Sequence, residues 1–180
     1  MLYLEAPVRE KNIVRGITNR FLQWVAMYAP SNKIRKRMHQ WRGVKIGAGG
    51  FIMQETILET SHPEWISIGN HVDIGIRCVV MAHFRGREQQ GKSQDDFAVI
   101  IEDDVYIGHC VVILPNVRIG RGSVVTAGSV VTRNIPPMMV VQGNPAKPIA
   151  RCGIPLGEET RYEDFIRNLK PLKSVCSTSM

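Results

Sequence analysis

The sequence predicts a mainly β chain wound into a three-sided prism of short parallel strands. The first observation is a ladder of β-branched residues at every sixth position, with no slip along its length. This period differs from the 3.6-residue repeat of an amphipathic helix and from the irregular turn signals, about 8–12 residues apart, of a β-sandwich. The ladder consists of Ile101, Ile107, Ile113, Ile119, Val125 and Val131.

The other positions of the six-residue unit provide the second observation. Small or β-branched side chains, which fit a narrow interior, come four residues after the ladder positions, and residue types that tolerate a left-handed turn come three residues after them. We therefore expect inward columns and tight corners, with successive coils stacked at about 4.8 Å. The inward set is Val105, Val111, Val117, Ser123 and Ser129, and the corner set is Asp104, Cys110, Asn116, Gly122, Gly128 and Asn134.

The same register extends toward the N-terminus and predicts about four coils. It reappears at Ile68, Ile74 and Val80, and again at Ile46, Ile52 and Leu58. A polar, glycine-containing segment breaks the register between residues 82 and 98, and we expect it to loop out from the prism, where functional residues are often found. The prism as a whole is expected to span residues 44–151.

Helices are expected on both sides of the prism. Apolar side chains recur at helical spacing from about residue 10 to residue 28, and Pro30 ends the pattern. A second helix is expected from Ser31, as its N-cap, to Trp41. Residues 1–43 would then form a helical cap over the first coil, whose open strand edge would otherwise invite aggregation. Residues 152–180 are expected to form a tail with one short helix from Glu158 to Leu169.

The chain has 180 residues, is 44% hydrophobic and carries a formal net charge of +7. The excess charge lies in the N-terminal part, where a solvated basic face is the simplest interpretation. An acidic membrane surface, or the phosphates of a lipid-linked or nucleotide-linked substrate, would also fit. Nucleic acid is not expected, because no recognition motif accompanies the charge. The basic residues are Lys11, Arg15, Arg20, Lys33, Arg35, Lys36, Arg37, Arg42 and Lys45.

The four cysteines are scattered and form no CxxC pair, so neither a disulfide framework nor a metal site is expected. Cys78 falls in the small inward column, where a packing role is expected, and Cys110 falls at a corner. No N-terminal apolar run has the length of a signal peptide or a membrane span, and we therefore expect a cytoplasmic protein.

From Val44 to Arg151 the chain resembles the hexapeptide-repeat acyltransferases, which are left-handed parallel β-helix enzymes that transfer an acetyl group from acetyl-coenzyme A. The ladder and the segments IIEDDVYIGHCVVILPNVRIGRGSVVTAGSVVTRNIPP and GNPAKPI carry the resemblance. The chain is most similar to the sugar and polysaccharide O-acetyltransferases of the maltose, galactoside and nodulation type. The resemblance implies acetyl-CoA as donor, a hydroxyl of a sugar or polysaccharide precursor as acceptor, and a homotrimer with an active site at each subunit junction.

The resemblance assigns the catalytic base to a histidine at the start of the looped-out segment, which in this chain is His83. An imidazole with an ordinary pKa of about 6.5 accepts the proton of an acceptor hydroxyl as the C–O bond forms. Such assistance is worth about a hundred- to ten-thousand-fold in rate. Because the thioester is already activated, direct transfer in a ternary complex is expected, without a covalent acyl-enzyme.

The same resemblance implies where coenzyme A and the acceptor bind. Arg133 and Lys147 carry charges suited to the ribose 3′-phosphate and the diphosphate. Tyr106 and Glu59 are weaker candidates for contacts on the acceptor side, and no metal is expected. The full set of positions that match the family's coenzyme A contacts is His109, Ala127, Thr132, Arg133 and Lys147.

Several other functions remain open at this stage. The same reaction on an amine would make the chain an N-acetyltransferase of an amino sugar, an amino acid or an antibiotic. A γ-class carbonic anhydrase uses the same prism with three histidines around zinc, and here His83 and His109 match two of the places while Leu114 occupies the third. A non-catalytic trimeric scaffold and peripheral membrane contact through the basic helices are further alternatives.

Overall fold

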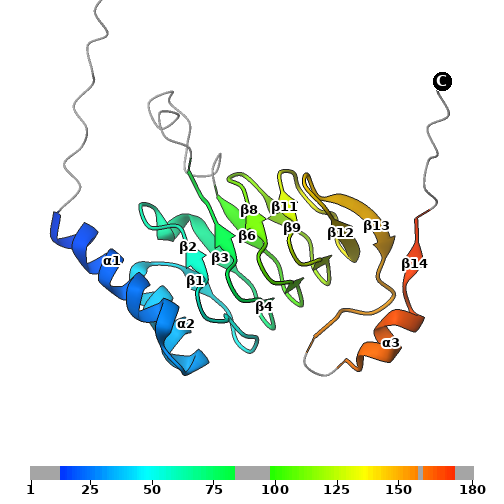
Figure 1. Cartoon of the computed structure of the whole chain (residues 1–180), viewed down its shortest axis with the longest axis horizontal. Helices are drawn as coiled ribbons and strands as arrows, with labels where there is room; N and C mark the ends of the chain where they lie inside the picture. The colour runs from blue at the N-terminus through cyan, green and yellow to red at the C-terminus, as the bar shows by residue number, and fades with distance from the viewer. Residues whose placement is uncertain (1–12, 84–97, 158–159, 173–180) are drawn as a thin grey trace, which may run out of the picture.

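The computed structural model of the chain describes residues 13–83, 98–157 and 160–172. Three sheets form the sides of a prism, and we name them A, B and C in the order in which the chain visits them (Figure 1). The fold is a left-handed parallel β-helix, as predicted. Sheet A contains β1 (Lys45–Ile46), β3 (Ile66–Ile68), β6 (Val99–Ile101) and β9 (Arg118–Ile119); sheet C contains β2 (Ile57–Leu58), β5 (Val79–Val80), β8 (Val112–Ile113) and β11 (Val130–Val131).

Sheet B is the largest side and includes the C-terminal strands. The coils contribute β4 (Asp73–Ile74), β7 (Tyr106–Ile107), β10 (Val124–Val125) and β12 (Met139–Gln142), and an antiparallel extension adds β13 (Lys147–Arg151) and β14 (Lys170–Pro171). The coils continue past Pro136 and Pro137, since Ile135 bridges to Ile119 and β12 pairs in parallel with β10. The prolines occupy the corner between these two sides.

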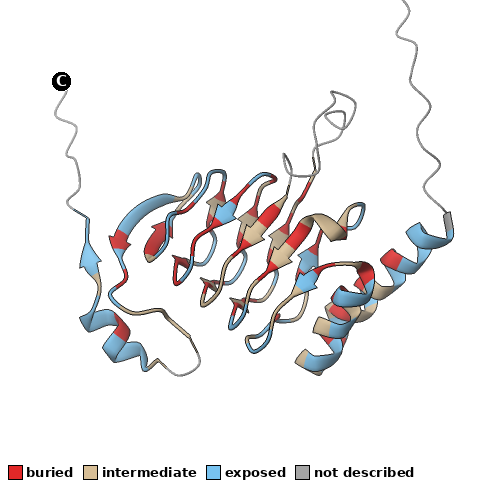
Figure 2. Ribbon diagram, turned by 180° about the vertical axis from the view of Figure 1, so that it is seen from behind, coloured by how far each residue is buried: buried red, intermediate tan, exposed pale blue. Residues whose placement is uncertain are grey.

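The interior of the prism is filled by the ladder (Figure 2). Ile107, Ile113 and Ile119 have no exposed surface, and the strands stack in register so that each ladder residue lies over the one a coil earlier. The inward serines are equally buried, and their hydroxyls bond to the backbone of the next coil. The Ser123 hydroxyl donates to the Pro136 carbonyl at 2.8 Å, and Ser129 Oγ accepts from the Gly143 N–H at 3.1 Å.

The corners are tight left-handed turns. Asp104, Cys110 and Asn116 have φ values of 59°, 57° and 60°, and Gly122 and Gly128 also have positive φ, as predicted. Asn134 departs from the prediction and does not have a positive φ. Its side-chain oxygen instead accepts a hydrogen bond from the Arg118 N–H at 2.8 Å, which ties the corner to the preceding coil.

The C-terminal segment covers the outer face of sheet B. The expected helix is shorter than predicted: α3 runs over Tyr162–Arg167, and residues 158–159 lie outside the described part of the chain. Phe165 of α3 is buried against Val124 and Val140 on the outer side of the sheet. Residues 173–180 of the predicted tail and residues 84–97 of the predicted excursion also lie outside the described part of the chain.

Helices α1 (Ile13–Tyr28) and α2 (Asn32–Arg42) lie across the N-terminal end of the prism (Figure 1). Ser31 is the N-cap residue of α2, as predicted, but its side chain makes no capping hydrogen bond, and Gly43 ends the helix with a φ of 108°. No helix within the described ranges is long and apolar enough to cross a membrane.

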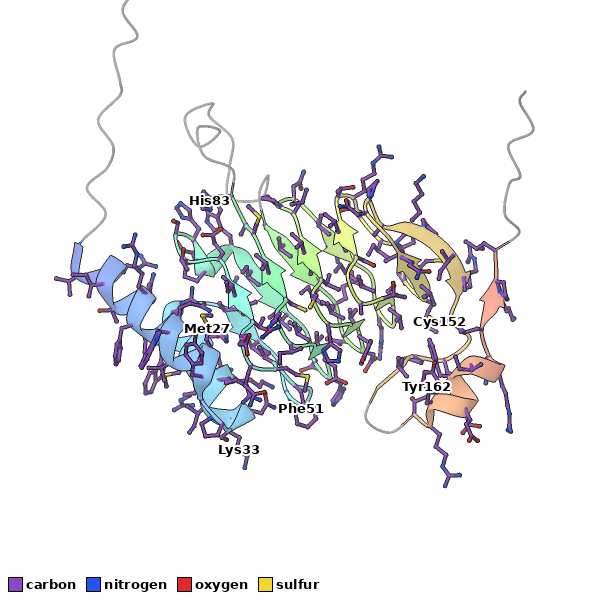
Figure 3. The ribbon with its side chains drawn as sticks, viewed as in Figure 1. Met27, Lys33, Phe51, His83, Cys152 and Tyr162 are labelled. Carbon is purple, nitrogen blue, oxygen red and sulfur yellow. The ribbon has the colours of Figure 1, made fainter. Side chains whose placement is uncertain are left out.

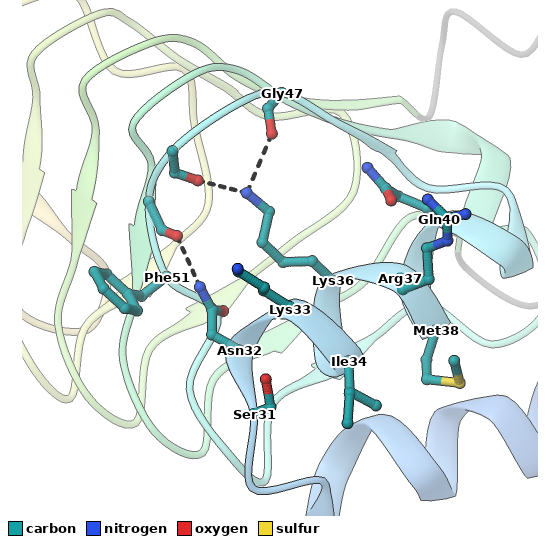
Figure 4. Close-up of a pocket in the computed structure, with 12 residues that line it drawn as sticks. Ser31, Asn32, Lys33, Ile34, Lys36, Arg37, Met38, Gln40, Gly47 and Phe51 are labelled. Atoms are coloured by element: carbon teal, nitrogen blue, oxygen red, sulfur yellow. Dashed lines mark hydrogen bonds between the residues drawn. The ribbon is translucent and has the colours of Figure 1, made fainter.

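Polar side chains close the end of the prism by donating to carbonyls of the first coil. Arg35 Nε donates to Ile52 O at 2.6 Å, and Arg42 Nη2 donates to Leu58 O at 2.9 Å. Arg35 and Arg42 are 6% and 2% exposed, so a solvated basic face is wrong for these two residues. Further donors from the cap are Gln23 to Thr56 O, Asn32 to Gly50 O and Lys36 to Gly47 O, the last two of which are drawn in Figure 4.

His39 lies in the same polar layer between the cap and the prism. Its side chain is 1% exposed, and its Nδ1 lies 3.0 Å from Arg42 Nη1. Burial, together with the positive charges of Arg42 and Arg35, lowers the pKa of His39 to about 3. The imidazole is therefore neutral in the folded chain and accepts a hydrogen bond from the guanidinium.

Candidate active site

The corner between sheets C and A carries His83. The chain leaves β5 at Val80, turns inward at the fully buried Ala82, and places His83 at the point where the described residues stop (Figure 3). The strand register aligns Val80 with Leu58 one coil earlier and with Ile113 one coil later. The corner that follows β2 therefore lies directly beside the corner that holds His83.

Glu59 comes from that neighbouring corner and contacts His83. Its Oε2 lies 2.6 Å from His83 Nδ1, and the side chains of Glu59 and His83 are 6% and 27% exposed. An ionised carboxylate only accepts hydrogen bonds, so Nδ1 carries the proton and donates it to Glu59. In the neutral imidazole the other ring nitrogen, Nε2, is then unprotonated and has a free lone pair. This is the tautomer that a general base requires.

The carboxylate of Glu59 is held by the backbone on both of its oxygens. Oε1 accepts from the Ser61 N–H at 2.7 Å, and Oε2 accepts from the Ala82 N–H at 3.1 Å as well as from His83. Burial raises the pKa of the Glu59 carboxyl, but the hydrogen bonds from Ser61, His83 and Ala82 together outweigh burial and leave the pKa below its ordinary value. The carboxylate is therefore ionised at neutral pH.

An aromatic pair lines the other side of the imidazole. The rings of His62 and Trp65 stack with centroids 3.9 Å apart and planes 7° apart. The His62 ring meets the His83 ring edge-on, with centroids 5.7 Å apart. Trp65 lies on the short 3₁₀ helix η1 (Pro63–Trp65) that follows the corner of Glu59. The structure therefore places His62, which the sequence analysis does not single out, against the ring of His83.

The strand register alone could have shown that Glu59 and His62 lie beside His83. Counting three residues from Leu58 reaches Ser61, and counting three residues from Val80 reaches His83, so the two breaks in the ladder occupy the same corner on consecutive coils. Glu59 was expected to contact the acceptor. In the structure its oxygens instead accept hydrogen bonds from Ser61, Ala82 and His83.

The predicted coenzyme A residues divide between two corners. Thr132 and Arg133 follow β11 and lie on the same corner as His83, two coils nearer the C-terminus, and both are exposed. His109 and Ala127 lie on the corner between sheets B and C, and Lys147 begins β13 beyond it. Sheet C separates the two groups, so one chain does not bring all five positions together.

His109 has a structural contact of its own. Its Nδ1 accepts a hydrogen bond from the Ile76 N–H at 3.0 Å, which leaves the proton on Nε2 at the exposed side of the corner. Because His83 and His109 lie on different corners, the described residues do not join these two imidazoles within one chain.

Tyr106 lies on the outer face of sheet B, the side of the prism opposite to the corner of His83. There it lines an apolar cavity of about 540 Å³ between sheet B and the C-terminal segment, together with Tyr162 and Phe165. The structure therefore does not bring Tyr106 to His83 within a single chain.

Known proteins share the repeat and the fold of this chain. The family model of the bacterial transferase hexapeptide (six repeats) matches residues 98–133. The crystal structure of the hexapeptide-repeat containing acetyltransferase VCA0836 from Vibrio cholerae superposes with a TM-score of 0.61 at 26% identity and covers 77% of this chain and 91% of that one. In its repeat sequence and in its fold, the chain is similar to the hexapeptide-repeat acetyltransferases.

Two further acetyltransferases match the chain over different extents. A 2,3,4,5-tetrahydropyridine-2,6-dicarboxylate N-acetyltransferase of Clostridium perfringens is 50% identical over 68 residues, which are 38% of this chain and 29% of that protein. The maltose O-acetyltransferase of Clostridium difficile 630 shares the fold, with a TM-score of 0.55 at 21% identity over 77% of this chain and 87% of that one. The chain thus spans less than half the length of the curated relatives it matches.

Proposed function

We propose that the chain is an acetyl-CoA-dependent acyltransferase that acetylates a hydroxyl of a sugar or polysaccharide precursor, with His83 as the general base. The observation that carries the proposal is the 2.6 Å contact between Glu59 and His83 Nδ1, which leaves Nε2 unprotonated at a prism corner. VCA0836 has also been solved in complex with acetyl-coenzyme A, which supports the choice of donor for this fold.

In the proposed reaction His83 Nε2 takes the proton of the acceptor hydroxyl while the oxygen attacks the thioester carbonyl. The C–O bond forms, the tetrahedral intermediate collapses, and the C–S bond breaks. The imidazolium then returns its proton to the departing sulfur, which gives the acetyl ester and the free thiol of coenzyme A. Glu59 remains ionised throughout, keeps the ring in the reactive tautomer and stabilises the imidazolium by its charge.

An amine acceptor is the second candidate, and the N-acetyltransferase of Clostridium perfringens is the observation that favours it. The hydroxyl is preferred because of the Glu59–His83 pair. A hydroxyl must lose its proton during attack, whereas an amine is already nucleophilic once it is neutral. A hydroxyl acceptor therefore gains more than an amine from a general base that is supported by a buried carboxylate.

A homotrimer would complete the site. The outer face of sheet C carries Ile57, Val79, Val112 and Val130, one from each coil, and this uncharged stripe is suited to contact with a second copy. Sheet C is bordered on one edge by the corner of His83 and on the other by the corner of His109 and Ala127. Packing between copies would make grooves along both edges, and in each groove His83 of one copy would meet the coenzyme A residues of another.

The proposal is tested by measuring release of free thiol from acetyl-CoA with a panel of sugars, nucleotide sugars and amino acids. We expect turnover with a hydroxyl acceptor, and we expect His83→Ala to lower it at least a hundredfold. His71→Asn is the matched control, because it removes an exposed imidazole from another corner and asparagine tolerates the φ of 53° there. Near-normal turnover in His83→Ala would remove His83 from the base role, and amines as the only acceptors would favour the second candidate.

A further inference from the structure

Helix α1 turns its apolar side away from the prism. Its buried positions are Asn19, Gln23 and Ala26, whose relative exposures are 8%, 5% and 1%. The opposite stripe carries large apolar side chains at alternating spacings of three and four residues. Its members are Val14, Ile17, Phe21, Trp24 and Tyr28, which are 60–70% exposed. An apolar stripe on an amphipathic helix normally faces the core, so this orientation indicates that the stripe serves an external contact.

Aromatic side chains make up much of this outer surface. The rings of Phe21 and Trp24 stack with centroids 6.5 Å apart, and Trp24 and Tyr28 meet at 5.9 Å. Helix α2 adds Trp41, which is 63% exposed. The guanidinium of Arg37 lies 5.9 Å from the centre of the Trp41 ring. Both helices therefore present tryptophan to solvent at the same end of the prism.

The charge of this surface is of one sign. Neither α1 nor α2 contains an aspartate or a glutamate. Arg20 lies one turn from both Ile17 and Trp24, and Lys33 and Arg37 line an open groove of about 1050 Å³ beside α2 (Figure 4). All three cations are exposed. These three are distinct from Arg35 and Arg42, which are buried in the cap, and from Arg15, which pairs with Glu64 at 3.5 Å.

We propose that this cap surface, formed by the outer sides of α1 and α2, docks onto an anionic lipid bilayer. Tryptophan and tyrosine favour the interface between lipid and water, and flanking arginine and lysine are attracted to anionic headgroups. A second copy of the chain is a poorer occupant, because pairing two such surfaces would bring their uncompensated cations together. The bilayer contact uses both the aromatic residues and the charges.

The test is sedimentation of the full chain with vesicles of phosphatidylcholine, with and without phosphatidylglycerol. We expect binding to the vesicles that contain phosphatidylglycerol, weakened by salt. Trp24→Ser should reduce the partition coefficient about tenfold or more. Arg20→Gln and Lys33→Gln should each reduce it about fivefold on the anionic vesicles only. Tyr162→Ser is the matched control, since it removes an aromatic ring that is 68% exposed at the other end of the prism (Figure 3).

All of the changed side chains are exposed, so the variants should keep the circular dichroism spectrum of the native chain. Equal sedimentation of Trp24→Ser and Tyr162→Ser, or binding without any dependence on phosphatidylglycerol, would overturn the proposal. A Trp24-dependent oligomer in light scattering, without vesicle binding, would assign the surface to a second copy instead. The measurement needs neither acetyl-CoA nor an acceptor, so it stands or falls separately from the acyltransferase proposal.

Discussion

Glu59→Gln is the sharpest test of the candidate active site, because it keeps the shape of the side chain and removes its charge. The carboxylate accepts from the Ser61 N–H, the Ala82 N–H and His83 Nδ1. An amide has a single accepting oxygen, so its NH₂ group must face either Ser61 or the pair of Ala82 and His83. In the second arrangement the NH₂ group donates to Nδ1, and the ring proton moves to Nε2. That tautomer cannot act as the base.

Two effects set the size of the loss. Each arrangement leaves one backbone N–H unpaired, so the two are similar in free energy and roughly half of the molecules hold the wrong tautomer. The lost charge matters more. Unit charges about 4 Å apart attract by about 4 kcal/mol at an effective dielectric constant of about 20, and a half-transferred proton realises about half of this. A loss of about 2 kcal/mol is about thirtyfold in rate, so we expect a thirty- to hundredfold fall in kcat.

Initial rates of thiol release at saturating acetyl-CoA, with the acceptor found in the panel, measure this fall. The KM for acetyl-CoA should stay the same, because Glu59 is buried behind His83 and is 6% exposed. Glu55→Gln is the control, since it neutralises a carboxylate on the same coil that pairs with Arg77 at the surface. A kcat for Glu59→Gln within about threefold of the native value would refute the view that the carboxylate orients and stabilises the imidazole.

Three further outcomes follow from the structure. The pKa of His39 is about 3 in the fold and 6.5 unfolded, so its contribution to stability is complete above pH 6.5 and is lost as the pH falls toward 3. Between pH 7.5 and pH 5 the native chain should lose about 2 kcal/mol of unfolding free energy that His39→Gln does not lose, as measured by urea denaturation. An equal change in the free energy of unfolding for the native chain and for His39→Gln would contradict this. Burial raises the pKa of the Cys78 thiol to about 11. N-ethylmaleimide at pH 8 should therefore modify the exposed Cys110 and spare the buried Cys78, as measured by peptide mass spectrometry. Equal modification of the two cysteines would show that the interior around Cys78 opens to solvent. Val112→Glu places a charge in the centre of the sheet C stripe and should convert a trimer to monomers in light scattering, whereas an unchanged trimer would place the subunit contact elsewhere.

The prism could be predicted because its sequence signal is local and repeated. Ladder residues six positions apart lie on successive sides of the prism, and each stacks on the equivalent residue of the next coil, as Ile107 stacks on Val125. Every sixth position is therefore subject to the same requirement for a β-branched side chain, and every tight corner to a requirement for a residue that tolerates it. Asn134 departs from the corner pattern because a side-chain hydrogen bond to Arg118 is available there. The short α3 departs because its extent depends on packing of Phe165 against sheet B, and this contact is not visible in the sequence around it.

The cap shows the limit of reasoning from periodicity. The spacing of apolar residues predicts the helix but not which side of it is buried. The end of the prism presents backbone carbonyls, which need donors, and Arg35, Arg42 and Gln23 supply them. The apolar stripe of α1 is therefore left outside. Glu59 was assigned to the acceptor for a related reason, since its partner His83 lies 24 residues away and is reached only through the coil register.

Arg42 joins two parts of the molecule that would otherwise be separable. Its Nη2 donates to the carbonyls of both Leu58 and Glu59, at 2.9 and 2.5 Å, so a residue of α2 anchors the backbone that carries the carboxylate beside His83. A chimera that took its first 43 residues from a relative would lose these two hydrogen bonds unless the relative supplied an equivalent arginine. Exchange of the N-terminal region would therefore change the support of Glu59, and with it the position of His83, although neither residue was exchanged.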